Sequence, residues 1–171
     1  MQYSGTFAPR SLAPGSSSQS GGTATAERPA IDDPIQEARD LLRQAAHLPF
    51  SARFPGQWSM RFTGHIAAAR GALLRHIART ARPGSTINRI EAAEPRLHAA
   101  LERQREEHLA LSRQVDELYM EANLHLDADI WRMIDLGERA ILLEMALARH
   151  HNRLARLLDE ATNRELGGEA G

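Results

Sequence analysis

Residues 97–122 read LHAALERQREEHLALSRQVDELYMEA. Uncharged residues recur in this stretch at steps of three and four, namely Leu97, Leu101, Gln104, His108, Leu111, Val115, Leu118 and Ala122. That spacing matches the turn of an α-helix, so these residues lie along one face of it, which we call its seam. Arg103 and Glu107 lie outside this seam and four residues apart, where opposite charges can pair on the solvent-facing side of a helix. The stretch predicts a long amphipathic helix with a histidine on its inward seam.

Two further stretches show the same spacing. One lies between Pro55-Gly56 and Pro83-Gly84, and its seam residues are Trp58, Phe62, His65, Ala69, Ala72 and His76. The other lies between the polar break 123–127 and Gly167-Gly168, and its seam residues are Ala140, Leu143, Leu147, His150, Leu154, Leu157 and Ala161. Proline and glycine pairs end helices, so each stretch is expected to form a separate helix.

The N-terminal part divides into a tail and a first helix. Asp33-Pro34-Ile35-Gln36 combines an N-cap acid, a proline at the first helical position and a glutamine for a capping box, which predicts a helix from Asp33 to about His47. The residues before it are mostly Ser, Gly, Thr, Ala and Pro, which cannot offset the entropy of ordering them. We therefore expect a disordered tail over 1–31 and one helical domain over 32–168.

No stretch alternates with a period of two, and Val115 is the only valine, so strands are not expected. A short additional helix is predicted over Thr86–Glu94, capped by Ser85, before Pro95 starts the helix of the opening stretch. Long helices joined by short connections pack antiparallel to their neighbours. The predicted fold is all-α, an up-down antiparallel four-helix bundle with a disordered N-terminal tail.

Composition excludes several function classes. The net charge of −1 supplies no field that attracts nucleic acid, and the absence of cysteine excludes disulfides, zinc fingers, iron–sulfur clusters and thiol catalysis. No apolar run approaches the roughly 20 residues that span a bilayer, and the N-terminus lacks the basic start and apolar core of a secretory signal. We expect a cytoplasmic protein that binds neither nucleic acid nor membrane.

His76, His108 and His150 are the candidate site residues, because each falls on the inward seam of a different helix. Neutral imidazole is the commonest protein ligand for metal ions, and helical bundles build metal sites in their interior. The alternative is that each is a core histidine whose nitrogens are satisfied by hydrogen bonds. His65 lies about 16 Å along its helix from His76 and cannot join it, and His98, His125 and His151 are expected at the surface or at helix ends.

Carboxylates are missing at the spacing that a di-iron bundle uses. Such bundles place an acid three or four residues from a ligand histidine on the same helix. The residues at those positions are Arg79 and Thr80 after His76, Leu111 and Ser112 after His108, and Arg153 and Leu154 after His150. The sequence therefore predicts histidines without acidic partners, and arginines that repel a cation.

Three segments resemble hemerythrin-like proteins of the HHE cation-binding type, in particular the divergent bacterial branch. They are 58–82, ending in His76-Ile77-Ala78-Arg79-Thr80-Ala81; 87–108, ending in Glu106-Glu107-His108; and 147–168, which contains Leu147-Ala148-Arg149-His150 and ends in Glu165-Leu166-Gly167-Gly168. Together the three segments cover most of 58–168.

The resemblance implies a four-helix bundle whose histidines and two carboxylates hold two non-haem irons that bind oxygen. His76, His108 and His150 look like the ligand histidines. The acid that usually follows the second-helix histidine is replaced by Thr80-Ala81, the acid after the last-helix histidine is missing, and His47 sits too near a helix end to be a ligand. The resemblance therefore implies an incomplete iron ligand set.

Three functions follow as expectations. The first is a hemerythrin-like binding or sensing module with a reduced or lost non-haem iron site, and not an enzyme. The second is a functional iron and oxygen-binding protein, or an iron-dependent oxidase or peroxidase with Glu107 or Tyr119 as proton donor. The third is a structural bundle that binds a protein partner through the apolar residues Leu48, Phe50 and Phe54.

Overall fold

The computed structural model describes residues 33–50, 54–124 and 129–167, and every element in them is helical. The elements are α1 (Pro34–Ala46), α2 (Pro55–Ala81), α3 (Thr86–Ala93), the 3-10 turn η1 (Pro95–Leu97), α4 (His98–Leu124) and α5 (Ile130–Gly167). The predicted all-α class is confirmed for this part of the chain. The predicted tail over 1–31 lies outside the described residues.

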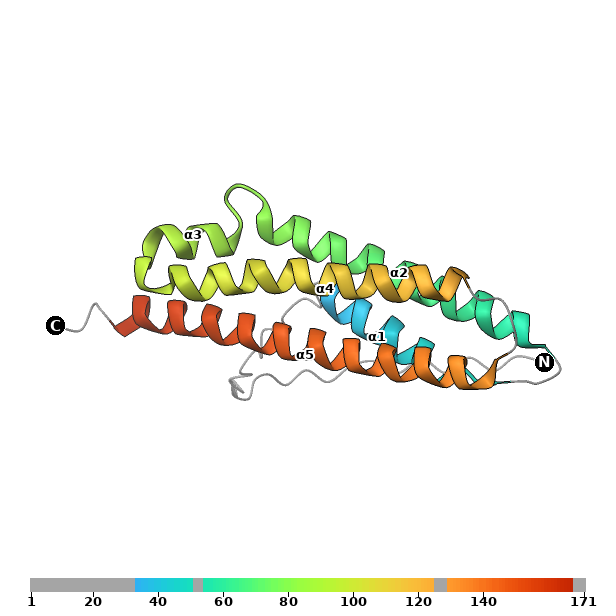
Figure 1. Cartoon of the computed structure of the whole chain (residues 1–171). Helices are drawn as coiled ribbons and strands as arrows, with labels where there is room; N and C mark the ends of the chain where they lie inside the picture. Colours follow the sequence, from blue (N-terminus) through green and yellow to red (C-terminus); the bar gives the residue numbers. More distant parts are fainter. Residues whose placement is uncertain (1–32, 51–53, 125–128, 168–171) are drawn as a thin grey trace, which may run out of the picture.

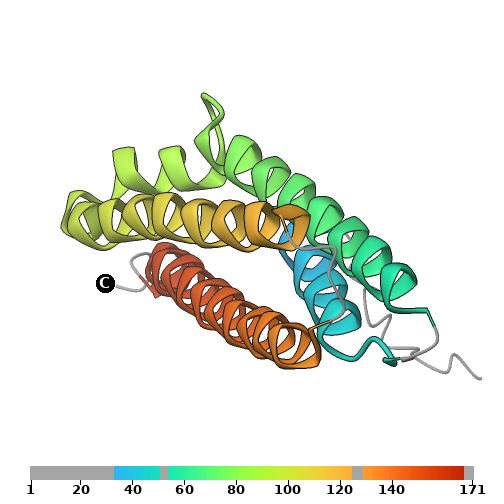
Figure 2. The same cartoon turned by 45° about the vertical axis from the view of Figure 1, so that its right-hand side comes forward.

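The three long helices lie side by side, with α1 and α3 covering them at different places (Figure 1). Helix α4 packs against both α2 and α5, and the chain direction reverses from α2 to α4 and again from α4 to α5. Helix α1 packs against α2 and α5, as Figure 2 shows from a second side. Because α1 has 13 residues and α5 has 38, α1 covers only part of the length.

Local signals at the helix starts are those that the sequence predicts, with one exception. The Asp33 carboxylate accepts a hydrogen bond from the Ile35 N–H (3.1 Å) and caps α1. The predicted capping box is wrong in its second half, because the Gln36 side-chain oxygen accepts from Arg39 (2.9 Å) instead. Ser85 caps α3 by accepting from the Asn88 N–H (3.2 Å), directly after Gly84 turns the chain with φ +74°.

Helix α2 begins at Pro55, three residues before Trp58, the first residue of its predicted seam. Proline suits a first helical position, since its φ angle is already helical and an N–H there needs no partner in the helix. The Trp58 indole stacks on Phe62 with ring centroids 4.8 Å apart, and its N–H donates to the Leu48 carbonyl (3.3 Å). These contacts tie Leu48, just after the end of α1, to the core.

Two separate apolar cores stabilise the molecule. The larger joins α1, α2, α4 and α5 and contains Leu42, Phe62, Leu73, Leu111 and Leu147, among others. The smaller joins α3, η1, α4 and α5, and its buried residues are Ile87, Leu97, Leu101, Leu154 and Ala161. Burying a large apolar side chain contributes about 1.5–3 kcal/mol, so each core holds its own set of helices together.

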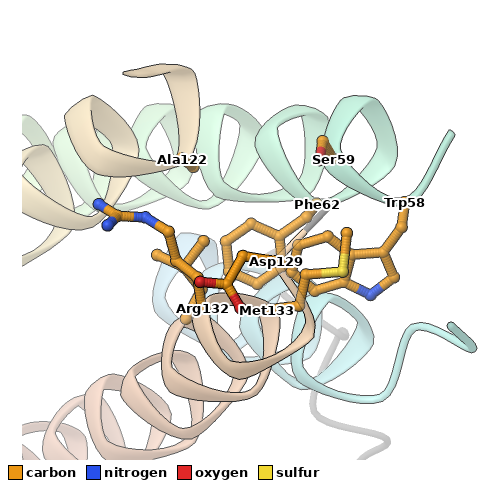
Figure 3. A pocket seen from close by; sticks show the side chains of 8 residues that line it. Trp58, Ser59, Phe62, Ala122, Asp129, Arg132 and Met133 are labelled. Carbon is orange, nitrogen blue, oxygen red and sulfur yellow. The ribbon is translucent and has the colours of Figure 1, made fainter. Parts of the chain in front are cut away.

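A small cavity lies at the end of the larger core where α2, α4 and α5 meet (Figure 3). It has a volume of about 10 Å³, room for one water molecule, and Trp58, Ser59, Phe62 and Arg132 are among its lining residues. The Arg132 Nε–H is buried without a hydrogen-bond partner among the described residues.

Among the described residues, no helix combines the length and the apolar character that crossing a bilayer requires.

Candidate metal centre

His76, His108 and His150 come together between the two apolar cores. On α4, His108 lies between Leu101 of the smaller core and Leu111 of the larger one. On α5, His150 lies in the same way between Leu154 and Leu147. Helix α2 supplies His76 one turn after Leu73. The three imidazoles therefore form a polar layer in an otherwise apolar interior.

The three rings are close enough to share one ligand. Their potential ligand nitrogens all lie within 4.8 Å of one another, and the rings of His108 and His150 have centroids 4.7 Å apart. The His76 ring stands nearly perpendicular to both, at centroid distances of 5.3 Å from His108 and 5.6 Å from His150. The exposed fractions are 6% for His76, 6% for His108 and 0% for His150. The seams therefore predicted correctly that each of these side chains lies inside the molecule, and the packing of the helices brings the three rings together.

The distance between His108 and His150 fits two ligands of one metal ion. Their Nε2 atoms are 3.0 Å apart. Two nitrogens that each bind a metal at about 2.1 Å are separated by about 3.0 Å when the angle at the metal is near 90°, and by about 3.4 Å in a tetrahedral site. The third nitrogen, from His76, lies up to 4.8 Å from the others and would need to move by at most about 2 Å to reach the same ion.

Hydrogen bonds fix the tautomer of His150. Its Nδ1 lies 3.0 Å from a Glu107 carboxylate oxygen. A carboxylate only accepts, so His150 Nδ1 carries the proton and the neutral ring presents the Nε2 lone pair to the centre of the cluster. The same Glu107 oxygen also accepts from Arg153, whose Nη2 is 2.8 Å away. Histidines that bind metals commonly donate their second N–H to a carboxylate in this way.

Two buried polar atoms of this layer lack partners within the described residues. They are the His76 Nε2 and the Gln104 Oε1, and Gln104 lies one helical turn before His108 on α4. Leaving a buried polar group without a hydrogen bond costs about 1–3 kcal/mol, so such atoms are rare in native proteins. A metal ion bound by His76 Nε2 would satisfy the first of them.

Burial keeps the three imidazoles neutral. Burial, together with the neighbouring His150, lowers the pKa of His76 from 6.5 to about 4. It also lowers the pKa of His108 to about 3, together with the charges of His150 and His76, and lowers the pKa of His150. Only a neutral ring can offer a lone pair to a metal, and all three rings are neutral at pH 7; His108, whose Nε2–H donates to His150 Nε2, would have to carry its proton on Nδ1 to bind one.

The prediction that no acid accompanies these histidines is wrong. Glu107, expected on the solvated face of α4, has a side chain only 30% exposed and faces α5. Asp33, the cap of α1, lies with one oxygen 4.0 Å from His76 Nδ1 and with the other 3.3 Å from His151 Nδ1. His151 was expected at the surface, yet its side chain is 35% exposed and pairs with Asp33.

The acids were missed because they come from other helices. Sequence spacing tests only residues on the same helical face, whereas Glu107 reaches His150 from α4 and Asp33 reaches His76 from the start of α1. Neither acid belongs to the group of potential ligands, which contains only the three histidines. Arg153, predicted to repel a cation, is neutralised by Glu107. Glu107 therefore orients His150 through a hydrogen bond, and both acids place negative charge beside the histidines without being members of the ligand group.

The other histidines lie away from this cluster. His65 is half-buried on α2, three turns before His76, and His98 is exposed beside Glu91, with its Nδ1 2.7 Å from a carboxylate oxygen. His47 is exposed at the end of α1, as predicted, and His125 lies outside the described residues.

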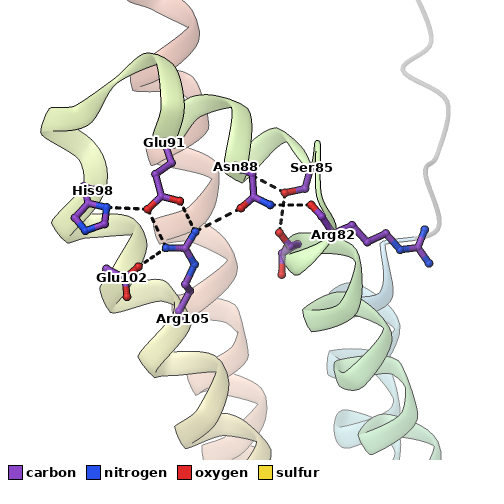
Figure 4. Close-up of polar contacts among 8 residues, drawn as sticks. Arg82, Ser85, Asn88, Glu91, His98, Glu102 and Arg105 are labelled. Carbon is purple, nitrogen blue, oxygen red and sulfur yellow. Dashed lines mark hydrogen bonds and ion pairs between the residues drawn. The ribbon is translucent and has the colours of Figure 1, made fainter.

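A second group of potential ligands, Glu91, His98 and Glu102, is already paired with a cation of the chain (Figure 4). Arg105 donates to the carboxylates of both Glu91 and Glu102, and also to Asn88 Oδ1 at 3.4 Å. The hydrogen bond from Arg105 holds the pKa of Glu91 down at about 2. This network fastens α3 to α4 and uses the charges that a metal ion would need.

Comparison with known proteins finds no matching family model, no matching curated protein and no matching solved structure. The chemistry of the site is therefore argued from its residues.

Proposed function

We propose that this protein is a hemerythrin-like helical module that binds one divalent transition-metal ion through His76, His108 and His150. The proposal rests on three buried imidazoles whose potential ligand nitrogens lie within 4.8 Å of one another. One nitrogen of this group of side chains, His76 Nε2, has no hydrogen-bond partner among the described residues. The same proposal includes the finer fold, in which α1, α2, α4 and α5 form an up-down antiparallel four-helix bundle.

The residues around the histidines support a bound cation. Glu107 and Asp33 place two negative charges next to His150 and His76, which raises the affinity of the neighbouring rings for a positive ion. Three imidazoles suit iron, zinc, nickel and copper by ligand type. The resemblance to hemerythrin-like proteins favours non-haem iron, and the ligand set favours one ion over two, because carboxylates that would bridge a pair are not among the potential ligands.

A binding or sensing role fits this site better than a catalytic one. Three protein ligands leave coordination positions for a small molecule such as oxygen. The two acids at the cluster are engaged, Glu107 with His150 and Arg153, and Asp33 with the start of α1 and His151. A proton donor for an oxidase or peroxidase would have to be released from one of these contacts first.

Metal analysis of the purified protein tests the proposal. Metal-free protein titrated with Fe²⁺, Zn²⁺ and Co²⁺ should bind one ion per chain, and His108→Leu should weaken binding at least about 100-fold because one of three ligands is lost. His65→Leu is the matched control, since it removes a half-buried histidine of α2 outside the cluster. Binding that is absent, or unchanged in His108→Leu, contradicts the proposal. Two irons per chain with an oxygen-sensitive spectrum would instead indicate a dinuclear centre.

The hydrogen bond between His108 and His150 favours a second candidate, a purely structural polar layer. In that case the histidines fix the register of α4 against α5 without any ion. Metal titration of the unaltered protein separates the two candidates, because a structural layer predicts no metal binding, whereas the proposed site binds one ion per chain.

A further inference from the structure

Helix α5 is apolar on two opposite faces. Its inward face buries Leu136, Ala140, Leu143 and Leu147 in the larger core. Its opposite face, which we call the outward seam, begins with Trp131, Ile134, Glu138, Ile141 and Met145, again at steps of three and four. The exposed fractions of its four apolar members are 76%, 47%, 40% and 46%. A solvated helix face is normally polar, so these side chains indicate a contact surface.

The outward seam changes character along the helix. After Met145 it continues through Arg149, Asn152 and Arg156, which are all exposed. Its first half therefore carries large apolar residues and one acid, and its second half carries two arginines. A surface with this polarity complements a copy of itself turned end to end.

We propose that the outward seam of α5 pairs with the same seam of a second copy of this chain, antiparallel, about a two-fold axis between Ile141 and Met145. A two-fold interface brings the same patch of both copies together, so the patch must complement itself. In this register Ile141 of one copy packs on Met145 of the other, and Glu138 lies opposite Arg149. Each contact occurs twice, on the two sides of the axis.

Charge selects this register over its neighbours. An axis through Glu138 would bury more apolar surface but would place the two copies of Glu138 against each other, and like charges in contact are destabilising. The proposed register replaces that repulsion with two Glu138–Arg149 ion pairs. It also places Arg156 of one copy next to the exposed Trp131 of the other, where a guanidinium can stack on the indole.

The outward seam plays no part in binding a metal ion, so the pairing of α5 does not depend on whether an ion is bound. His150 lies on the inward face of α5 and is fully buried, whereas the apolar residues of the outward seam are exposed and only Arg149 of the seam borders a hollow beside α4. Failure of the metal proposal would leave the pairing of α5 untouched.

Charge exchange between the two copies tests the register. The oligomeric state and dissociation constant would be measured by sedimentation equilibrium for the full chain and for Glu138→Arg, Arg149→Glu and the double variant. Each single change puts two like-charged pairs in the interface and should weaken dimerisation about tenfold or more. The double variant restores opposite charges and should recover most of that loss. A double variant as weak as the singles would overturn the register.

A second comparison tests the surface itself. Ile141→Asp should give a monomer, because it puts a charge into the centre of the interface, while Leu109→Asp, at a residue of α4 that is 67% exposed, should leave the dimer intact. Circular dichroism and thermal melting would show that both variants keep their fold. A full chain that stays monomeric up to its solubility limit, or a dimer that Ile141→Asp leaves intact, overturns the proposal.

Discussion

At the scale of single residues, the hydrogen-bond partners of the three histidines decide how they behave. His150 has its Nδ1 tied to Glu107 and its Nε2 aimed at His108, and His76 has its Nδ1 near Asp33 and its Nε2 unpartnered among the described residues. The ring of His150 is thus oriented by a hydrogen bond to a carboxylate, and the ring of His76 has a carboxylate 4.0 Å away. That arrangement predicts that changes at the acids alter metal binding without removing a ligand.

Glu107→Gln is expected to lower metal affinity by about 10–100-fold, because it removes the negative charge behind His150. Isothermal titration with Zn²⁺ or Co²⁺ measures the effect. Glu106→Gln is the matched control, since Glu106 is the exposed neighbour on the same helix. Equal affinities of the two variants would mean that Glu107 does not support a ligand.

Stability of the metal-free protein should fall as the pH drops below about 6.5. Burial lowers the pKa of His76 to about 4 and of His108 to about 3, so the unfolded chain takes up protons at a higher pH than the folded chain. The stability that these groups contribute is complete above 6.5 and is lost between 6.5 and those values, by about 1.4 kcal/mol per pKa unit at most. Urea unfolding at pH 7, 6 and 5 measures the loss, and a His76→Leu/His108→Leu variant should show a smaller slope.

At the scale of elements, Asp33 joins the start of α1 to the candidate centre. One carboxylate caps the Ile35 N–H and lies beside both His76 of α2 and His151 of α5. Helix α1 is also fastened to α5 by Arg39 and Arg43, which both pair with Glu144 at 2.9–3.0 Å. The N-terminus of α1 is thus held beside the histidines, where the Asp33 carboxylate would interact electrostatically with a bound ion.

Two substitutions at Asp33 separate its roles. Asn is as good an N-cap as Asp, so Asp33→Asn should leave the free energy of unfolding of the metal-free protein nearly unchanged while weakening metal binding. Asp33→Ala loses the cap as well and should cost about 1 kcal/mol. Chemical unfolding and metal titration of both variants check the expectation. If Asp33→Asn binds metal as tightly as the unaltered chain, the charge of Asp33 does not contribute to metal binding.

At the scale of the whole molecule, the histidine layer joins two cores that would otherwise be stabilised separately. Residues of α4 and α5 enter both cores, whereas α1 and α2 contribute only to the larger and α3 only to the smaller. An ion bound by α2, α4 and α5 would tie the three long helices together at the boundary. Metal binding should therefore raise the stability of the molecule as one unit.

Thermal unfolding with and without metal tests this coupling. At a free ion concentration about 100 times the dissociation constant, binding should stabilise the native state by about 2.7 kcal/mol and raise the melting temperature in a single transition. The His108→Leu variant should show no shift. A shift confined to one of two transitions would mean that the cores unfold independently.

Much of this molecule follows from periodicity and capping alone. The step of three and four placed His76, His108 and His150 on inward seams, and Asp33, Ser85 and the proline–glycine pairs marked where helices start and stop. These features are local, since each depends on residues within a turn or two of one another. Helix type and burial could therefore be predicted from the sequence.

What only the tertiary structure decided is which side chains face each other across helices. Glu107 and Asp33 were missed because the rotation and axial height of one helix against another depend on packing along its whole length, and no local pattern records them. For the same reason, only the structure shows that the inward seam of α5 is buried in the core while the apolar residues of the outward seam stay exposed. The sequence determined the helices and the inward position of the three imidazoles, and the packing of the helices determined the carboxylates that accompany them.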